Sequence, residues 1–274
     1  MDMLTAQADV TGGQVERAMQ LLQQRTGIIV GEHKMKSSQR LLFGLCKQYG
    51  FSSIDAFLNE IANNDKHPVW ESFINAFTIN HTAFFREPHH FEMLAQYLEK
   101  HRTNCEMWCA AASTGQEPYS MAMVLNEVLG EHTVCPVITA TDIDSNALKR
   151  ARAGVYNLGE LNGVSPERLK RHFLRGVNSF EGKARVKPAL ASRVEFSELN
   201  LISPSWPHKN LFDVIFCRNT MIYFDRDTQI RLIAGFARVM KPGGLLFIGH
   251  SETLASVTDK FTLLGQTVYQ RNSS

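Results

Sequence analysis

Short apolar runs that alternate with helical segments constrain the fold of this chain more than any other feature of its sequence. Four such runs follow residue 105, and each ends in polar residues: "MWCAAA", "VCPVITATDID", "FDVIFCRN" and "GGLLFIGHSE". Helical patterns over 118–129, 145–155 and 228–240 lie between them. Continuous apolar strands that alternate with helices are typical of a parallel sheet covered on both faces. The pattern therefore predicts an α/β fold.

The first part of the chain shows amphipathic helices and no strand candidate. The segment "GGQVERAMQLLQQRTG" places Val15, Met19 and Leu22 on one stripe and ends at a glycine suited to a helix end. The segment "SSQRLLFGLCKQYG" begins with serines suited to capping, and "EPHHFEMLAQYLEKH" opens with Pro88. We therefore predict an all-helical N-terminal domain over 1–87 and an α/β domain over 88–274.

Two later segments depart from the alternation. The stretch "RGVNSFEGKARVKPALASRVEFSELN" contains the turn signal "SFEG" between short strand-like pieces. It predicts a small antiparallel β-subdomain inserted at about 173–200. The stretch "FTLLGQTVYQRN" alternates more strictly and is followed by no helix. We expect it to form an antiparallel edge strand.

Composition narrows the class of protein. The chain has 29 basic and 27 acidic residues and a net charge of +2, whereas nucleic-acid-binding domains are usually strongly basic. No window approaches the ~18 consecutive apolar residues of a membrane span, and the N-terminus lacks the apolar core of a signal peptide. The five cysteines form no C-x-x-C pair, which favours free thiols in a reducing, cytoplasmic setting: Cys46, Cys105, Cys109, Cys135 and Cys217.

Carboxylates stand at the strand ends where an open parallel sheet binds its ligands. The turn after the first strand has one glycine, Gly115, followed by Glu117, and the second strand ends in Asp142 and Asp144. An acid after the second strand often binds ribose hydroxyls. Glu117 would repel a pyrophosphate, so a ligand with a ribose and a positive group, such as S-adenosylmethionine, fits better than NAD or FAD. Two simpler interpretations stay open: Glu117 as an acid that complements the helix dipole, and Asp142 as a helix N-cap.

Five motifs in order resemble the chemotaxis receptor methyltransferases, the CheR family: "FINAFTINHTAFFREPHHF", "WCAAASTGQEPYSMAM", "TDIDSNALKRARAGVY", "FDVIFCRNTMIYFD" and "KPGGLLFIGHSETL". The likeness runs from about residue 15 to residue 270. It implies a Rossmann-like class I fold with a helical N-terminal domain and an inserted β-subdomain. It also implies methyl esterification of specific glutamates on bacterial chemoreceptors, with S-adenosylmethionine as donor and S-adenosylhomocysteine as product.

The resemblance also carries over site residues by motif. Those matched to the cofactor site are Asn80, Thr82, Arg86, Glu117, Asp142, Asn200, Leu201, Arg218 and Asn219. Arg86 and Tyr223 match the catalytic positions, with Tyr223 near the transferring methyl group. Simpler interpretations remain: Arg86 in an ion pair with Glu87, and Tyr223 as a packed aromatic residue.

We expect no metal site in this protein. Adjacent helical residues point about 100° apart, so His89 and His90 are interpreted as solvent-facing or capping residues rather than metal ligands. Phe84 and Phe85 are interpreted as core. The role of His250, at a strand end, stays open.

The expected partner is a receptor's helical coiled coil. Basic residues in or near the second helix are suited to it, although a solvated helix face is an equally good interpretation: Lys34, Lys36, Arg40 and Lys47. The β-subdomain could bind a receptor C-terminal peptide as an added strand. We expect a monomer that binds no nucleic acid and does not insert into membranes. The alternatives are a methyltransferase for a small carboxylate or a nucleic acid, and a non-catalytic cofactor-binding module.

Overall fold

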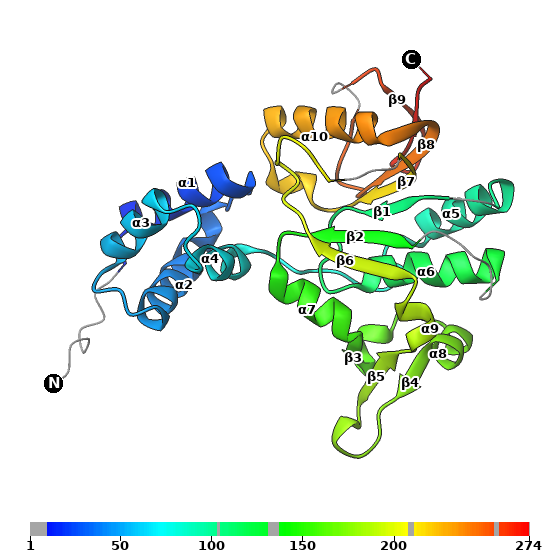
Figure 1. Ribbon diagram of the computed structural model, residues 1–274, viewed down its shortest axis with the longest axis horizontal. Coiled ribbons are helices and arrows are strands. Elements are labelled where there is room, and N and C mark those ends of the chain that lie inside the picture. Colours follow the sequence, from blue (N-terminus) through cyan, green and yellow to red (C-terminus); the bar gives the residue numbers. More distant parts are fainter. Residues whose placement is uncertain (1–9, 103–104, 131–136, 208–210, 255–257, 274) are drawn as a thin grey trace. The chain divides into compact units, whose positions relative to one another are not determined.

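The computed structural model describes residues 10–102, 105–130, 137–207, 211–254 and 258–273 and is shown in Figure 1. By its internal contacts the chain forms two compact units. One contains the residues up to Ile79 together with Tyr223–Asp225, and the other contains Asn80–Ile222 and the residues from Arg226 onward. The contacts thus divide the chain after Ile79, a few residues before the predicted boundary at residue 87. None of the helices in the described part is long and apolar enough to cross a membrane.

The first unit is helical, as its sequence pattern predicts. Its elements are α1 (Gly12–Thr26), η1 (Glu32–Lys34), α2 (Met35–Gln48), α3 (Ile54–Asn63) and α4 (Val69–Phe77). Thr11 caps α1 with a capping box, and Gly27 ends it at a φ of 75°. The predicted serine cap of α2 is wrong, because α2 begins at Met35 and Ser37 instead donates to the Lys34 carbonyl at 2.8 Å. Buried apolar side chains from all four α-helices form the core of this unit.

The second unit is built on a seven-stranded sheet of order β6-β2-β1-β7-β8-β10-β9. The strands are β1 (Met107–Cys109), β2 (Ile138–Asp142), β6 (Val194–Glu198), β7 (Phe212–Cys217), β8 (Met240–Ile248), β9 (Phe261–Gly265) and β10 (Val268–Arg271). The first five in this order are parallel. The predicted antiparallel edge is confirmed, although "FTLLGQTVYQRN" forms a hairpin of two strands, β9 and β10, rather than one.

Helices cover both faces of this sheet (Figure 1). They are α5 (Pro88–Lys100), α6 (Gln116–Leu129), α7 (Ser145–Ala153) and α10 (Arg226–Val239). Successive residues of β1 face opposite layers, as the two-residue period of a strand requires. Met107 and Cys109 belong to the core that α5 and α6 share, whereas Trp108 packs on Phe236 of α10 at a ring distance of 5.5 Å. Burial on both faces explains why the parallel strands read as continuous apolar runs.

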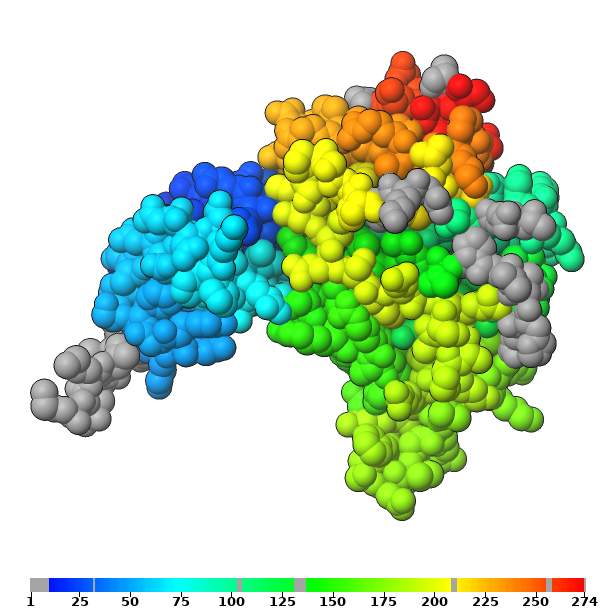
Figure 2. Space-filling model, in the orientation of Figure 1, coloured from blue at the N-terminus to red at the C-terminus, as the bar shows by residue number. Residues whose placement is uncertain are grey.

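The inserted subdomain is a three-stranded antiparallel sheet of order β3-β5-β4. Its elements are β3 (Val155–Asn157), η2 (Leu158–Leu161), α8 (Pro166–His172), β4 (Phe173–Arg175), η3 (Asn178–Phe180), β5 (Lys183–Val186) and α9 (Pro188–Ala191). It begins earlier than the predicted segment, because Gly154 ends α7 at a φ of 60° and the next three residues pair with β5. The end of the predicted segment, 194–198, forms β6 of the main sheet. In Figure 2 the subdomain stands out from the rest of its unit.

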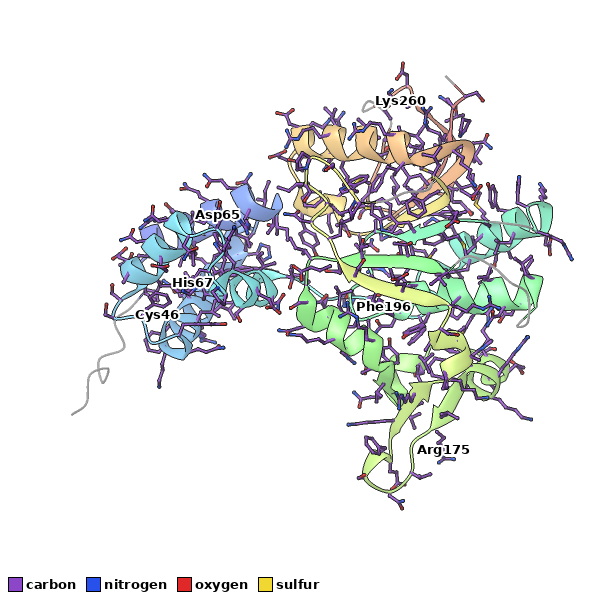
Figure 3. All side chains as sticks on the ribbon, in the orientation of Figure 1. Cys46, Asp65, His67, Arg175, Phe196 and Lys260 are labelled. Atoms are coloured by element: carbon purple, nitrogen blue, oxygen red, sulfur yellow. The ribbon has the colours of Figure 1, made fainter. Side chains whose placement is uncertain are left out.

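Exposed side chains mark the hairpin between β4 and β5. Figure 3 labels Arg175 there, at the end of β4 and in solvent. The same figure labels Cys46, which is buried in the helical unit. Of the five predicted free thiols, Cys46, Cys105, Cys109 and Cys217 are buried and unbridged, and Cys135 lies outside the described residues.

Candidate active site

The site lies at the carboxyl ends of the parallel strands, where the loops after β1, β2, β6, β7 and β8 meet. The first group of contacts there surrounds Asp142. The Ser113 N–H donates to Asp142 Oδ2 at 2.7 Å, and the Asp144 N–H donates to Oδ1 at 2.9 Å. Burial raises the pKa of Asp142 to about 6. Each carboxylate oxygen keeps a lone pair that a ligand hydroxyl could use, which fits the predicted ribose contact.

Asn80 joins this group from the loop that precedes α5. Its Nδ2 donates to Asp144 Oδ2 at 2.6 Å, and its Oδ1 accepts from the Ser113 hydroxyl at 2.8 Å. Asp144 also caps α7 by accepting from the Asn146 and Ala147 N–H groups. The alternative interpretation of Asp142 as that N-cap is therefore wrong, because Asp144 fills the position two residues later. Asp142 is left to face the loop of Ser113.

Asn200 and Leu201 follow β6, the strand beside β2. The Leu199 N–H donates to the Asp142 carbonyl at 3.0 Å, so the backbone just before Asn200 is tied to the strand end that carries Asp142. Asn200 Oδ1 accepts from the Ile202 N–H at 3.1 Å, which fixes the turn, and Leu201 is buried. This placement is compatible with the predicted adenine contact of the pair.

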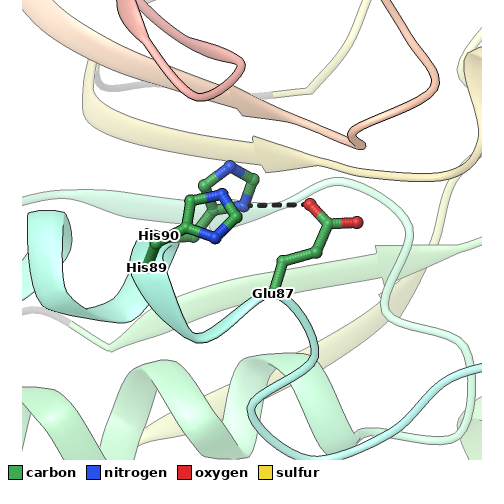
Figure 4. A group of neighbouring side chains, drawn as sticks. All are labelled: Glu87, His89 and His90. Atoms are coloured by element: carbon green, nitrogen blue, oxygen red, sulfur yellow. Dashed lines mark ion pairs between the residues drawn. The ribbon is translucent and has the colours of Figure 1, made fainter.

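The second group of contacts centres on Arg218, which follows β7 and is 5% exposed. Its Nη1 donates to Glu117 Oε2 at 2.7 Å, and its Nη2 lies 3.3 Å from Glu87 Oε2 and donates to the Arg86 carbonyl. The predicted alternative of an Arg86–Glu87 ion pair is wrong. Among the described residues Glu87 pairs with Arg218, with His250 at 3.1 Å and with His90 at 3.5 Å, the last pair being the dashed line in Figure 4. Arg86 Nη1 instead donates to the His81 carbonyl at 3.1 Å.

The charges of this group explain its titration. Burial alone would raise the pKa of Glu87, but the Arg218 guanidinium and the His250 hydrogen bond hold that pKa at about 2. Burial raises the pKa of Glu117 despite the opposing effect of Arg218. Two carboxylates and one guanidinium leave one formal negative charge when both acids are ionised. Arg218 therefore weakens, but does not abolish, the preference for a cationic occupant that Glu117 indicated.

Glu252 fixes the loop after β7, and our sequence reasoning gave it no role. Its carboxylate accepts four backbone N–H bonds, from Asn219 and Thr220 at 3.0 Å, Ile222 at 3.3 Å and Gly249 at 2.6 Å. Burial nevertheless raises its pKa. Gly249 is required here, because a Cβ at this position would lie 2.9 Å from the backbone nitrogen of Asn219 and 2.5 Å from its Nδ2. Glu252 ends the motif "GHSE", which follows a strand directly, and this position was the feature of the sequence that could have indicated its role.

His90 is fully buried, so the prediction of a solvent-facing or capping residue is wrong for it. Its helix turns this position toward the sheet, where the imidazole packs on Phe247 and its Nε2 meets the Gln266 carbonyl at 2.9 Å. Burial, followed by the charge of Arg218, lowers the pKa of His90 to about 4. Figure 4 shows His90 with His89 and Glu87, whose ligand atoms lie within 4.8 Å of one another. Because Arg218 already supplies the cation at Glu87, we assign no metal to this group.

Three predicted site residues have less direct support. Thr82 lies half-buried between Asn80 and Arg86. Asn219 is placed through its backbone, with a φ of 56°. Tyr223 ends η4 (Met221–Tyr223) and belongs by its contacts to the helical unit, where its carbonyl accepts from the Ile29 N–H at 2.8 Å. A position of its phenol beside the transferring methyl stays a prediction.

Comparisons with known proteins show similarity over most of the chain. Residues 80–270 match the family model described as CheR methyltransferase, SAM binding domain. The chain is 41% identical over 266 residues to the chemotaxis protein methyltransferase of Salmonella typhimurium, covering 97% of this chain and 92% of that protein. The chemotaxis protein methyltransferase of Escherichia coli K12 is also 41% identical, with coverages of 97% and 93%. Chemotaxis protein methyltransferase 2 of Pseudomonas aeruginosa is 40% identical, with coverages of 93% and 91%.

Proposed function

Because this chain belongs to the CheR methyltransferase family of S-adenosylmethionine-dependent chemotaxis proteins, we propose that it methylates glutamate side chains of bacterial chemoreceptors. The observation that supports S-adenosylmethionine as the cofactor is the set of carboxylates at the strand ends. Asp142 offers acceptors for ribose hydroxyls, and Glu87 with Glu117 outweighs the single charge of Arg218. This donor set fits a nucleoside with a positive charge and no phosphate.

Three buried acids of the described site are already engaged, and a fourth, Asp142, is assigned to the ribose, which supports a substrate that needs no base. Arg218 holds Glu87 and Glu117, and four N–H groups hold Glu252. A glutamate substrate has an ordinary pKa of about 4.3 and arrives ionised at neutral pH. An amine or hydroxyl substrate would have to lose a proton instead. The function of the protein is then to align the carboxylate and to exclude water.

We assign Arg86 to the cofactor's carboxylate. Its loop begins at Asn80, which is bonded to Ser113 and Asp144 on the ribose side, and ends at Glu87, which is bonded to Arg218. A guanidinium in this loop can hold a carboxylate with two parallel hydrogen bonds. Tyr223 is assigned to the methyl end. S-adenosylmethionine, when bound, supplies a methyl group that its sulfonium charge has already activated.

The test uses methyl-labelled S-adenosylmethionine and membranes that contain chemoreceptors. We expect label in the receptor that mild base releases as methanol, as a glutamyl ester requires. Base-stable label, or label in added RNA or in a small carboxylate instead, would favour another substrate. Binding of the cofactor with no transfer to any of these would favour a non-catalytic module.

Variants separate the assigned roles. Arg86→Ala should weaken S-adenosylhomocysteine binding about tenfold or more by calorimetry, since a bidentate charged contact is lost. Arg102→Ala, at an exposed arginine of the same unit, is the matched control. Unchanged cofactor affinity with a raised KM for the receptor would move Arg86 to the substrate's carboxylate.

His250 tests the class of substrate. It is 70% exposed at the side chain and bonded to Glu87, so it is the imidazole of this group best placed to act as a base. For a carboxylate substrate, His250→Gln should keep kcat within about threefold, because no proton is removed. A loss of a hundredfold or more would point to an amine or hydroxyl substrate.

Two surfaces are proposed for receptor binding. The edge strand β4 exposes Leu174 at 49%, and the hairpin after it exposes Val177 and Phe180 at 67% and 59%, which suits a peptide that adds a strand. We expect Val177→Asp to weaken binding of labelled receptor C-terminal peptides, with Leu158→Asp on the opposite edge as the control. On α2, Lys36 and Arg40 are exposed and are assigned to the acidic coiled coil. Charge reversal there should raise the receptor KM and leave S-adenosylhomocysteine affinity unchanged.

A further inference from the structure

The short segment around Arg86 is held in an unusual backbone conformation. Phe85 and Glu87, on either side of Arg86, have φ values of 51° and 57°. Such values are costly for residues with a side chain and persist only where the surroundings enforce them. Arg218 holds the Arg86 carbonyl and Glu87 on one side of this segment. The direction in which Arg86 points therefore also depends on what holds Phe84 and Phe85 on the other side.

The small antiparallel subdomain holds Phe84. The Phe84 ring packs edge-on against Tyr156 of β3 at 5.0 Å and Phe173 of β4 at 5.7 Å. Gly163, in the turn between η2 and α8, lies so close that a Cβ there would be 2.2 Å from the Phe84 carbonyl oxygen. The φ of Gly163 lies outside the left-handed region, so the close approach, and not backbone freedom, requires glycine at this position.

Phe85 is held from the same subdomain by Arg168 of α8. The guanidinium carbon of Arg168 lies 4.0 Å from the centre of the Phe85 ring. The same group donates two hydrogen bonds of 2.7 Å to Glu127 of α6. Because Ser120 of α6 also accepts the Phe85 N–H at 3.1 Å, α6 and α8 together enclose this residue.

We propose that the small subdomain sets the direction of Arg86, with Gly163 and Arg168 as positioning residues that act through Phe84 and Phe85. The inference rests on the proposed role of Arg86 toward the cofactor's carboxylate. It gives the subdomain a part in cofactor binding that is independent of any peptide bound to its hairpin. Simple core packing is the competing explanation, and it predicts lost stability without a specific effect on the cofactor.

The sharpest perturbation is Gly163→Ala, which directs one methyl group at the Phe84 carbonyl. The matched control is Gly159→Ala in the same subdomain, where a Cβ meets nothing within 4 Å. We expect Gly163→Ala to weaken S-adenosylhomocysteine binding about tenfold by calorimetry and Gly159→Ala to change it less than about twofold. Arg168→Gln should weaken it about threefold, Arg168→Lys less, and Lys170→Gln on the exposed side of α8 not at all.

A double-mutant cycle decides between positioning and packing. If Gly163 acts through Arg86, Gly163→Ala should weaken binding no further in an Arg86→Ala background. Independent, multiplying losses would overturn the proposal, and so would a Gly163→Ala protein with a lowered Tm but wild-type affinity. The proposed function fails in a different way, when wild-type protein binds S-adenosylhomocysteine but leaves receptor glutamates unmethylated. The calorimetric cycle remains valid in that case, because it involves no substrate.

Discussion

Replacing Arg218 by methionine should strongly destabilise the catalytic unit at neutral pH. The side chain is 5% exposed and is the shared cation of Glu87 and Glu117. Removing one partner of a buried ion pair costs ~3–5 kcal/mol, because the remaining charge stays in a poorly solvated place. The Arg86 carbonyl also loses a donor, which adds about 1 kcal/mol. We expect a loss near the upper end of this range.

The pH dependence of this loss identifies its cause. In the native protein the pKa of Glu87 is held at about 2, so its contribution to stability is present above the unfolded pKa and is lost as the pH falls toward 2. Without Arg218, burial raises the pKa of Glu87 and of Glu117, and each can relieve its cost by binding a proton. The destabilisation by Arg218→Met should therefore shrink as the pH falls from 8 to 5.5.

Urea unfolding at the two pH values measures the effect. Arg102→Met, at an exposed site, is the control, and Glu117→Gln combined with Arg218→Met should recover part of the loss. The reasoning is refuted if Arg218→Met costs less than about 1 kcal/mol at pH 8. It is also refuted if the cost is the same at both pH values, since packing and not charge would then explain it.

Three further perturbations test the carboxylates and the buried imidazole. Glu252→Gln leaves one carbonyl oxygen for four N–H groups and should cost about 2–3 kcal/mol in urea unfolding; a loss below 0.5 kcal/mol on that scale would contradict the role of Glu252. Because the pKa of Asp142 is about 6 and ligand hydroxyls bind its ionised form, S-adenosylhomocysteine affinity should fall about tenfold from pH 7.5 to pH 5. Asp142→Asn should bind weakly at both pH values, and a pH-independent wild type would count against this contact. The pKa of His90 is about 4 in the folded protein, so as the pH falls the unfolded chain protonates this imidazole at a higher pH than the folded chain does. Native stability should therefore fall by about 3 kcal/mol between pH 6.5 and pH 4. His90→Gln should flatten that slope, and an unchanged slope would exclude His90 as its source.

Local patterns were enough to predict the positions of the carboxylates but not their partners. Glu117 lies in the first turn of α6 and Asp142 at the end of β2, as the apolar runs and the turn at Gly115 indicated. The pairing of Glu87 with Arg218 was missed because these residues are far apart in the sequence. The pairing also depends on the left-handed backbone conformation of Glu87, and a glutamate in the sequence does not indicate that conformation.

Short elements were the least predictable part of the fold. The strand β3 has three residues and is separated from α7 by Gly154 alone, so the predicted helix over 145–155 ran into it. The segment 194–198 was assigned to the insertion, although its alternation suits either sheet, and its partner β2 decides the matter. His90 was misplaced because helical geometry gives the angle between neighbours but not which of them faces the core.

Strain and hydrogen bonding coincide at this site, which explains how its loops can be rigid without being regular. Four non-glycine residues there have a positive φ: Phe85, Glu87, Ser113 and Asn219. A side chain of another element binds each of them. Ser120 accepts the N–H of Phe85, Asp142 that of Ser113, and Glu252 that of Asn219. Arg218 binds the carboxylate of Glu87.

Each such backbone conformation costs of order 1–3 kcal/mol, which is close to the value of a hydrogen bond that a buried acceptor would otherwise lack. Removing the acceptor should therefore release the loop, whereas relieving the strain with glycine should not. Asn219→Gly is consequently expected to keep the native stability measured by urea unfolding, and Glu252→Gln to lower it, although both substitutions act on the same four-residue turn. Buried polar side chains, and not the loop sequences themselves, then determine the geometry of the site.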